Sequence, residues 1–307
     1  MDESTNTTLL CPGQGAQAVG MGKAWFDAFP VAAQTFAAAD KALGLSLTDL
    51  CFGGPAEQLN RTDMAQCAIY TASVACFQAL LESGAVGRFT ATAGLSLGEF
   101  TALHLAGAYD FIEGLNLVKL RGRAMQDAAE ASEGSMVAVT GDVTEEAIRE
   151  LCDKARGDGV LVPANFNSPM QVVVSGSVDA CERAVGVAGE MGFKPTPLTV
   201  AGAFHSPLMQ PAADRLSEAL DEVQWNAPNV PVISNVTGEP HHDDDLDSIK
   251  ANLVAQLTSP VRWTQSMQWA VANLPGRYVE LAPGKVLSGL MRRIDRGTKV
   301  ENFNEPK

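Results

Sequence analysis

Positive charge is scarce in this sequence of 307 residues. Its 22 Lys and Arg residues face 36 Asp and Glu residues, which gives a formal net charge of -14. No basic stripe is present that could displace counterions from a phosphate backbone. The composition therefore excludes general nucleic-acid binding.

Cysteine pairs and long apolar runs are also missing. The six cysteines are scattered and contain no CxxC pair, so we expect free thiols in a reducing compartment. The most apolar run, residues 68–81, contains Thr71, Ser73 and Gln78 and is too short to cross a bilayer, so it predicts a buried helix and no membrane span. Residues 1–8 lack the layout of a signal or transit peptide, and a mature form whose targeting segment was removed stays open as an alternative.

The remaining composition is that of an ordinary globular protein, with 46% hydrophobic and 19% charged residues and no repeat. Strand-like runs alternate with amphipathic helices, which predicts an α/β fold with a mostly parallel sheet covered by helices. The expected elements are strands at residues 7–11 and 89–95, helices at 32–43 and 66–82, and a helix that begins after an N-cap at Asp110 and runs to residue 131.

The stretch from residue 132 to 199 has a different order of elements. Strands are expected at residues 136–139, 160–164, 171–175 and 197–200, and helices at 144–155 and 178–191. This β-α-β-β-α-β order predicts an inserted ferredoxin-like small domain. The first pattern then returns, with a helix opened by Ser206 and Pro207, strands at 230–235 and 277–281, and helices at 246–257, 264–273 and 286–294. The large domain is therefore predicted to be discontinuous, comprising residues 1–131 and 200–307.

One motif indicates nucleophilic chemistry. Gly94-Leu95-Ser96-Leu97-Gly98 fits GxSxG and lies where a predicted strand meets a predicted helix. In that context the glycines allow a sharp turn that exposes the serine hydroxyl, with the following backbone N–H free to hold an oxyanion. Alone, the pattern also fits an ordinary glycine-flanked turn, so both interpretations stay open at this point.

A serine nucleophile needs a base, most often histidine. Of the four histidines, His241 and His242 lie in residues 238–245, whose composition predicts an exposed loop, and His104 projects from a different part of the helix after Ser96. His205 remains, just before a helix and just after the chain returns to the large domain. A capping or core role for this residue is the alternative.

Three further features concern ligands. Arg121 is expected at the edge of the apolar face of its helix, where a guanidinium needs an anion; a structural carboxylate such as Glu99 and a substrate carboxylate are the two candidates. The loop at residues 12–17 follows the first strand but is neither GxGxxG nor a P-loop, and Gln14 in it is our candidate for a second oxyanion-hole N–H. The run from His241 to Asp245 invites a metal site, but adjacent loop residues rarely converge on one ion, so we favour a solvated acidic turn that caps the next helix.

Taken together, six segments in chain order resemble the malonyl-CoA:acyl-carrier-protein transacylases of fatty-acid synthesis. They are Pro12-Gly13-Gln14-Gly15-Ala16-Gln17, Gly94-Leu95-Ser96-Leu97-Gly98-Glu99, Leu120-Arg121-Gly122, Asn165-Phe166-Asn167-Ser168-Pro169, Gly202-Ala203-Phe204-His205 and Pro283-Gly284-Lys285-Val286-Leu287. The resemblance implies an α/β-hydrolase-like core with a ferredoxin-like insertion. Leu95, where many relatives have histidine, resembles the plastid and cyanobacterial branch. The expected location is the cytoplasm of a bacterium, or the plastid stroma for a mature eukaryotic form.

The resemblance also implies a role for each matched position. Ser96 resembles the nucleophile, His205 its base, and Arg121 the clamp for the malonyl carboxylate. The oxyanion hole would be formed by the backbone N–H groups of Gln14 and Leu97.

Two positions near the base complete the expected site. A carbonyl oxygen of Gln256 would orient His205 in place of a triad acid. Phe204 resembles the malonyl-type pattern of polyketide acyltransferases.

The implied reaction is a ping-pong transfer of malonyl from malonyl-CoA to the phosphopantetheine thiol of acyl carrier protein. Because one thioester is exchanged for another, we expect no metal or nucleotide cofactor, and coenzyme A enters only as the thioester substrate. We expect a monomer that docks its acidic carrier on a local basic surface. The candidates for that surface are Lys194, Lys285, Arg292, Arg293, Arg296 and Lys299.

Three alternatives are weighed against this function. A serine thioesterase or esterase would need a triad acid between Ser96 and His205, but candidates such as Asp142 and Asp179 fall in the inserted module. A free-standing polyketide-type acyltransferase would differ mainly in acyl group and carrier. A non-catalytic carrier-binding protein would not need both Ser96 and His205.

Overall fold

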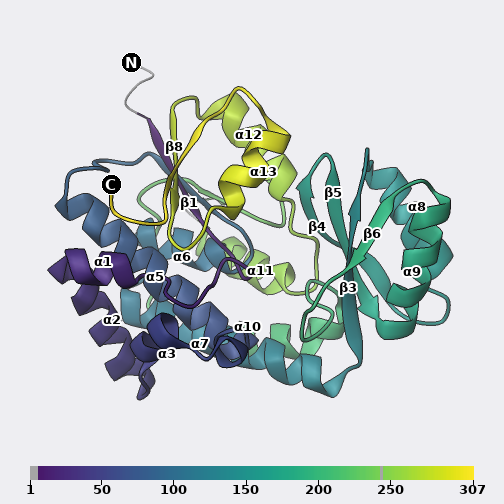
Figure 1. The fold of residues 1–307 in the computed structure, drawn as a ribbon, viewed down its shortest axis with the longest axis horizontal. Coiled ribbons are helices and arrows are strands. Elements are labelled where there is room, and N and C mark those ends of the chain that lie inside the picture. The colour runs from purple at the N-terminus through teal and green to yellow at the C-terminus, as the bar shows by residue number, and fades with distance from the viewer. Residues whose placement is uncertain (1–5, 243–244) are drawn as a thin grey trace.

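The structure is a computed structural model that describes residues 6–242 and 245–307. It has two parts, a larger one built on a parallel sheet and a smaller one built on an antiparallel sheet (Figure 1). The expectations for residues 1–5, at the start of the chain, and for Asp243 and Asp244, in the acidic turn, lie outside the described residues.

The larger sheet has the strand order β7-β2-β1-β8-β9, and all neighbouring pairs are parallel. Its strands are β1 (Thr7–Cys11), β2 (Ala91–Gly94), β7 (Val232–Ile233), β8 (Arg277–Leu281) and β9 (Val300–Phe303). Alternation along β1 sends Leu9 and Cys11 into the main apolar cluster and Leu10 into a second cluster on the opposite face. Both faces of the sheet are therefore buried, as is usual for parallel strands.

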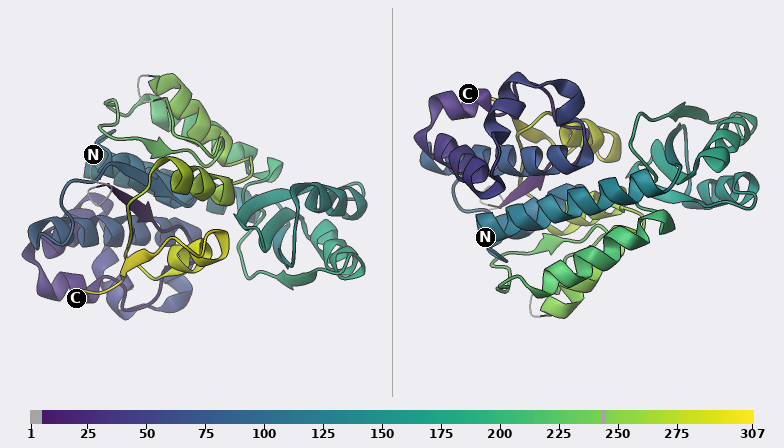
Figure 2. Two further views of the ribbon diagram at one scale, coloured as in Figure 1. Left: turned by 90° about the horizontal axis from the view of Figure 1, so that it is seen from above. Right: turned by 90° about the horizontal axis from the view of Figure 1, so that it is seen from below.

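Helices cover this sheet on both sides. The main cluster holds residues of α2 (Pro30–Leu43), α5 (Thr62–Glu82), α6 (Leu97–Leu105), α7 (Phe111–Ala131), α10 (Gln210–Asp221) and α11 (Leu246–Gln256). The second cluster holds residues of α12 (Trp263–Asn273) and α13 (Val286–Ile294). Helix α7 is long and runs from beneath the larger part toward the smaller one (Figure 2). Its N-terminus is closed by a capping box between Asp110 and Glu113, which confirms the predicted cap.

The smaller sheet has the order β4-β5-β3-β6 and is antiparallel. Its elements follow as β3 (Gly134–Thr140), α8 (Glu145–Ala155), β4 (Leu161–Ser168), β5 (Gln171–Ser177), α9 (Val178–Glu190) and β6 (Lys194–Pro197). Val137 and Val139 pack with α8 and α9, whereas Met136 and Ala138 point the other way into the main cluster. One face of the smaller sheet therefore joins the main apolar cluster, and the other face has a separate cluster with α8 and α9.

Several elements differ from the sequence expectation. The short helices α1 (Lys23–Ala28), α3 (Leu47–Gly53) and α4 (Ala56–Leu59) and the edge strand β9 were not predicted, because so few residues give little periodicity. The last strand of the small sheet was expected at residues 197–200 but lies at Lys194–Pro197, since Leu198 and Val200 pack against the main core instead. The helix expected from Ser206 begins as a short 3-10 turn, Pro207–Met209, before α10.

Helix α5 is longer than expected and begins at Thr62, whose backbone N–H donates to Gln126 on α7 at 3.2 Å. This cap comes from another helix, so the local sequence did not reveal it.

At 21 residues, α5 has the length and composition of a membrane span, and the expectation that it is too short was wrong. However, 83% of its most apolar window is buried inside the protein, which confirms the predicted buried helix. The six cysteines are also buried and unpaired, as predicted.

Candidate active site

The GxSxG segment forms a strained turn between β2 and α6. Ser96 has φ 52° and ψ -105°, a conformation that non-glycine residues rarely adopt. A Cβ atom at Gly94 would overlap the backbone of Gly98, and one at Gly98 would overlap the carbonyl oxygen of Cys11. Both glycines are therefore required sterically, and the predicted interpretation of the motif as a sharp turn is confirmed.

Asn235 holds this turn from the neighbouring strand. It lies two residues after β7, is 1% exposed, and accepts a hydrogen bond from the Ser96 backbone N–H at 2.6 Å while donating to the Gly94 carbonyl at 2.7 Å. The Ser96 N–H is thus occupied. Asn235 was not predicted from the sequence, although a polar side chain at the end of a buried strand is a usable signal.

Ser96 and His205 are brought together from distant segments. The Ser96 Oγ lies 2.9 Å from the His205 Nε2, and the His205 Nδ1 lies 2.7 Å from the backbone carbonyl oxygen of Gln256. Because a carbonyl only accepts, Nδ1 carries a proton, which in the neutral imidazole leaves the Nε2 lone pair facing the hydroxyl. His205 is 4% exposed and, like Ser96, has a positive φ, 56°.

The environment of His205 favours the neutral ring. Burial, and next the charge of Arg121, lower the pKa of His205 from 6.5 to about 4, against the opposing effect of the hydrogen bond to Gln256. At neutral pH the imidazole is therefore a neutral base with a free lone pair on Nε2.

Arg121 contacts the same hydroxyl. Its side chain comes from α7, is 1% exposed, and donates from Nη2 to the Ser96 Oγ at 3.0 Å and to the Gln256 Oε1 at 2.9 Å, and from Nη1 to the Gln66 Oε1 at 2.7 Å. The guanidinium also lies over the Phe100 ring, 5.2 Å from its centroid.

The charge of Arg121 has no carboxylate in contact with it within the described residues. Burial lowers the pKa of Arg121 to about 9, and the charge of Glu99 counteracts this, so the group stays a cation at neutral pH. Its Nε has no hydrogen-bond partner in the described part of the chain. The proposed structural partner, Glu99, is not in contact with the guanidinium, which leaves a buried cation that can accept an anion.

The other expected site residues surround this centre. Gln14 lies in the loop after β1, close to the turn, since a Cβ at Gly13 would overlap the Leu95 carbonyl oxygen. Leu97 is the first residue of α6, so its N–H has no partner within the helix and points from the positive end of the helix dipole. Phe204 is 6% exposed and belongs to the main apolar cluster.

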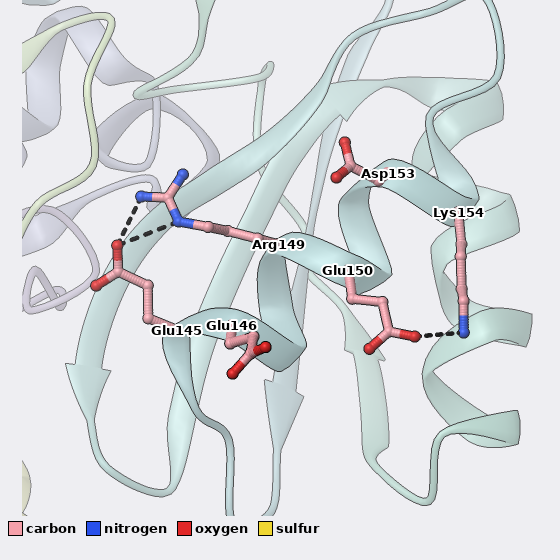
Figure 3. A pocket seen from close by; sticks show the side chains of 6 residues that line it. All are labelled: Glu145, Glu146, Arg149, Glu150, Asp153 and Lys154. Carbon is pink, nitrogen blue, oxygen red and sulfur yellow. Dashed lines mark hydrogen bonds and ion pairs between the residues drawn. The ribbon is translucent and has the colours of Figure 1, made fainter.

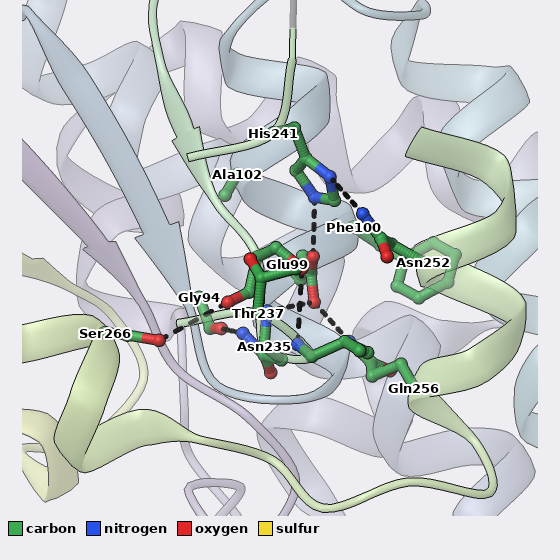
Figure 4. A network of polar contacts seen from close by, with 12 residues as sticks. Gly94, Glu99, Phe100, Ala102, Asn235, Thr237, His241, Asn252, Gln256 and Ser266 are labelled. Carbon is green, nitrogen blue, oxygen red and sulfur yellow. Dashed lines mark hydrogen bonds and ion pairs between the residues drawn. The ribbon is translucent and has the colours of Figure 1, made fainter. Parts of the chain in front are cut away.

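One histidine is placed differently from the expectation. His241 is buried, with its Nε2 2.7 Å from the Glu99 Oε1, and not exposed in a loop (Figure 4). The cause is a bridge between Ile233 and Pro240, which folds the segment back over β7 and so buries the ring beside a carboxylate. His242 is exposed and Asp245 caps α11, as expected.

The remaining polar clusters carry no comparable chemistry. No group of three or more potential metal ligands occurs within residues 6–242 and 245–307. His104 is half-buried with Nδ1 on the Tyr109 carbonyl, and burial lowers its pKa. A shallow surface hollow on α8 is lined by side chains that pair along the helix, such as Arg149 with Glu145 (Figure 3). It is a solvated helix face in the smaller part of the molecule.

Comparison with known proteins identifies the family. The acyl transferase domain matches residues 8–303. The malonyl CoA-acyl carrier protein transacylase of Bacillus subtilis is 42% identical over 97% of this chain and 93% of that protein. The enzyme of the same name from Escherichia coli is 41% identical over 98% of this chain and 97% of that protein. The chain belongs to the malonyl CoA-acyl carrier protein transacylase family.

Solved transacylases have the same fold. The malonyl CoA-acyl carrier protein transacylase of Clostridium perfringens superimposes with a TM-score of 0.92 at 37% identity, covering 98% of this chain and 94% of that one. A malonyl-transacylase in complex with a type II PKS acyl-carrier protein gives 0.94 at 37% identity, covering 98% and 96%. The predicted α/β fold with a mostly parallel sheet is thus confirmed, together with a separate antiparallel sheet.

Proposed function

We propose that this chain transfers the malonyl group of malonyl-CoA to the phosphopantetheine thiol of acyl carrier protein, through an ester on Ser96. The supporting observation is a buried guanidinium that lacks a carboxylate partner in the described structure and donates a hydrogen bond to the same hydroxyl that a neutral imidazole contacts. A short diacid thioester supplies both the missing anion and an electrophilic carbon. The relatives described above are malonyl CoA-acyl carrier protein transacylases, which supports the choice of donor and acceptor.

In the first half-reaction the Ser96 Oγ attacks the thioester carbonyl carbon while the His205 Nε2 takes its proton. The backbone N–H groups of Leu97 and Gln14 stabilise the oxyanion. The carbon–sulfur bond then breaks, and the coenzyme A sulfur leaves with the proton from His205. In the second half-reaction the carrier thiol gives its proton to His205 and attacks the ester, and Ser96 leaves as the hydroxyl.

The backbone carbonyl of Gln256 takes the place of a triad acid. It keeps the Nδ1 proton of His205 in position without adding a negative charge. Within the described residues no carboxylate contacts His205, and Asp142 and Asp179 lie in the smaller part of the molecule, which counts against the esterase alternative. Phe204, buried next to His205 in the chain, is assigned to limiting the size of the acyl group.

Intact-mass spectrometry tests this function directly. Mixing the protein with malonyl-CoA should add one malonyl group, and holo acyl carrier protein should then remove it. Acetyl-CoA should label the protein far less under the same conditions. Equal labelling by the two donors would contradict the assignment of the acyl group.

The pH dependence of acylation follows from the low pKa of His205. The neutral ring is the active form, so kcat/KM with malonyl-CoA should stay level from about pH 8 to about pH 5 and fall as the pH passes below the folded pKa of about 4. Tryptophan fluorescence over the same range would show whether the fold is intact. A half-maximal rate near the ordinary value of 6.5 would contradict the proposed environment of the base.

We place the carrier docking surface on the basic side chains at and after α13. Lys285, Arg292 and Arg293 are exposed there, on a protein whose net charge is -14. Because a carrier protein is itself acidic, local positive charge is needed to overcome the general repulsion.

Reversing the charge of Arg292 and Arg293 to Glu should raise the KM for the carrier about tenfold and leave acylation by malonyl-CoA unchanged. The matched control reverses the exposed Lys41 and Arg88, which changes the net charge equally. Equal effects of the two double variants on carrier kinetics would remove this surface from the proposal.

The carrier can belong to fatty-acid or polyketide synthesis. A polyketide biosynthesis malonyl CoA-acyl carrier protein transacylase of Bacillus velezensis is 37% identical over 95% of this chain and 98% of that protein, which supports the second source. Steady-state transfer to one purified carrier of each kind would decide between them.

The architecture and setting are proposed in the same way. We infer an α/β-hydrolase-like core of residues 1–131 and 200–307 with a ferredoxin-like domain of residues 132–199, supported by the order β4-β5-β3-β6 and a separate apolar cluster under α8 and α9. The protein would act as a monomer without cofactor, outside the membrane. Its free thiols support a reducing compartment, either the bacterial cytoplasm or the plastid stroma of a mature eukaryotic form.

A further inference from the structure

A buried carboxylate lies directly behind the candidate active site. Glu99 is the third residue of α6, is 1% exposed, and contacts no lysine or arginine within the described residues. Its Oε1 lies 2.7 Å from the His241 Nε2. Its Oε2 accepts from the Gln256 Nε2 at 2.6 Å and from the Asn235 N–H at 3.2 Å (Figure 4). Three donors therefore converge on one carboxylate.

Gln256 connects this carboxylate to the reacting groups. Its amide nitrogen also donates to the Ser96 carbonyl at 3.0 Å, its amide oxygen accepts from Arg121 at 2.9 Å, and its backbone carbonyl contacts His205. An amide has nearly the same shape after a half-turn, so sterics alone do not fix its orientation. A carboxylate only accepts and a guanidinium only donates, so Glu99 on one side and Arg121 on the other allow one orientation.

His241 completes the arrangement from the far side. Its ring is buried, and the Asn252 Nδ2 lies 3.4 Å from its other nitrogen. By occupying the Oε1 of Glu99, His241 leaves the Oε2 for Gln256 and Asn235. Neither Glu99 nor His241 contacts the Ser96 Oγ or the guanidinium. Glu99 reaches the Ser96 turn through the backbone N–H of Asn235, an effect that malonyl and acetyl donors share. It reaches Arg121 through the Gln256 amide and through its own charge.

We propose that Glu99, held by His241, is a positioning residue that fixes the Gln256 amide and thereby holds Arg121 in the orientation that receives the substrate carboxylate. This inference rests on the proposed function and adds a specificity determinant to it. It separates malonyl from acetyl donors, because only the malonyl group has a carboxylate for the guanidinium to bind.

The decisive variant is Glu99→Gln, which keeps the size of the side chain but places an NH₂ group where an oxygen accepted. On the Oε2 side this group faces the Asn235 N–H and the Gln256 amide, which must turn and present its own NH₂ to Arg121. On the Oε1 side it faces His241, which must then move its proton to Nδ1, opposite the Asn252 amide nitrogen. We expect kcat/KM for malonyl-CoA to fall about tenfold or more, the scale for a buried group left without a partner. The rate with acetyl-CoA should fall less than about threefold, so the malonyl-to-acetyl ratio falls.

The matched control is Glu113→Gln. Glu113 is the third residue of α7, as Glu99 is of α6, and it closes a helix cap away from Ser96. Its ratio should equal that of the parent. His241→Gln, which retains a donor toward Glu99, should keep the ratio within about twofold, whereas His241→Leu should lower it as Glu99→Gln does. Thermal melting would show whether Glu99→Gln folds. If it does not, the comparison of His241→Gln with His241→Leu still tests the positioning role.

A double variant tests whether the effect passes through Arg121. In the Arg121→Ala background, Glu99→Gln should change the ratio by less than about twofold. An equal loss with both donors, or a further full loss in that background, would show a purely structural role and overturn the inference. A parent that forms no malonyl adduct would overturn the proposed function itself, whereas a malonylated parent with an unchanged ratio in Glu99→Gln would overturn only the positioning role.

Discussion

Ser96→Ala should form no acyl adduct with malonyl-CoA and should lower malonyl transfer by about a thousandfold or more, the scale seen when a catalytic nucleophile is removed. The methyl group cannot attack the thioester, while Arg121 stays on α7 and His205 stays in the loop between β6 and the Pro207–Met209 turn. Intact-mass spectrometry would follow the adduct and a coupled assay the transfer rate.

The control for this variant is Ser83→Ala. Ser83 is an exposed residue at the end of α5, and its replacement should leave the adduct intact. A malonyl adduct on Ser96→Ala at the parental rate would place the nucleophile elsewhere and end the proposal.

Arg121→Ala should lower the malonyl-to-acetyl ratio of kcat/KM by roughly 30-fold to a few thousand-fold. This corresponds to about 2–5 kcal/mol for a desolvated charge pair that loses one partner. The value for malonyl-CoA falls because the malonyl carboxylate loses its cation. The value for acetyl-CoA rises because the acetyl group no longer leaves a buried cation unpaired. Donor competition, read as the mass of the acyl-enzyme, measures the ratio directly.

Two arginine controls sharpen this test. Arg123→Ala removes an exposed guanidinium from the same helix and should not change the ratio. Arg121→Lys keeps the charge but loses the planar fork and should recover only part of the discrimination. If Arg121→Ala kept the parental preference for malonyl, the carboxylate would have to be bound elsewhere.

The chemistry-bearing motifs were readable because they depend on local geometry. Gly94 is required by backbone overlap with Gly98 within the same motif, and Asp110 caps its helix through the nearby Glu113. Gly98 is required by the Cys11 carbonyl at the end of β1, a contact that the motif alone does not reveal. The order of strands and helices was largely readable for the same reason, since apolar periodicity is a local property. Short elements such as α4 and β9 were missed, and α5 was predicted too short because its first N–H is capped by Gln126 from α7.

The contacts of the polar groups behind the site could not be predicted from short stretches of sequence. Residues 238–245 have the composition of an exposed loop, yet His241 is buried because it and Pro240 pair back onto β7, where the ring meets Glu99. Asn235 acts on Ser96 only because β7 is the sheet neighbour of β2.

The amino-acid sequence by itself determined the alternation of elements, the sharp turn at Ser96 and the identity of the candidate base and cation. The tertiary structure alone decided that His205 faces a backbone carbonyl, that Arg121 has neutral partners, and that Glu99 pairs with His241. The physical reason is range: turns and caps are set by neighbours in the chain, whereas a buried polar group takes the partner that sheet closure and helix packing bring to it.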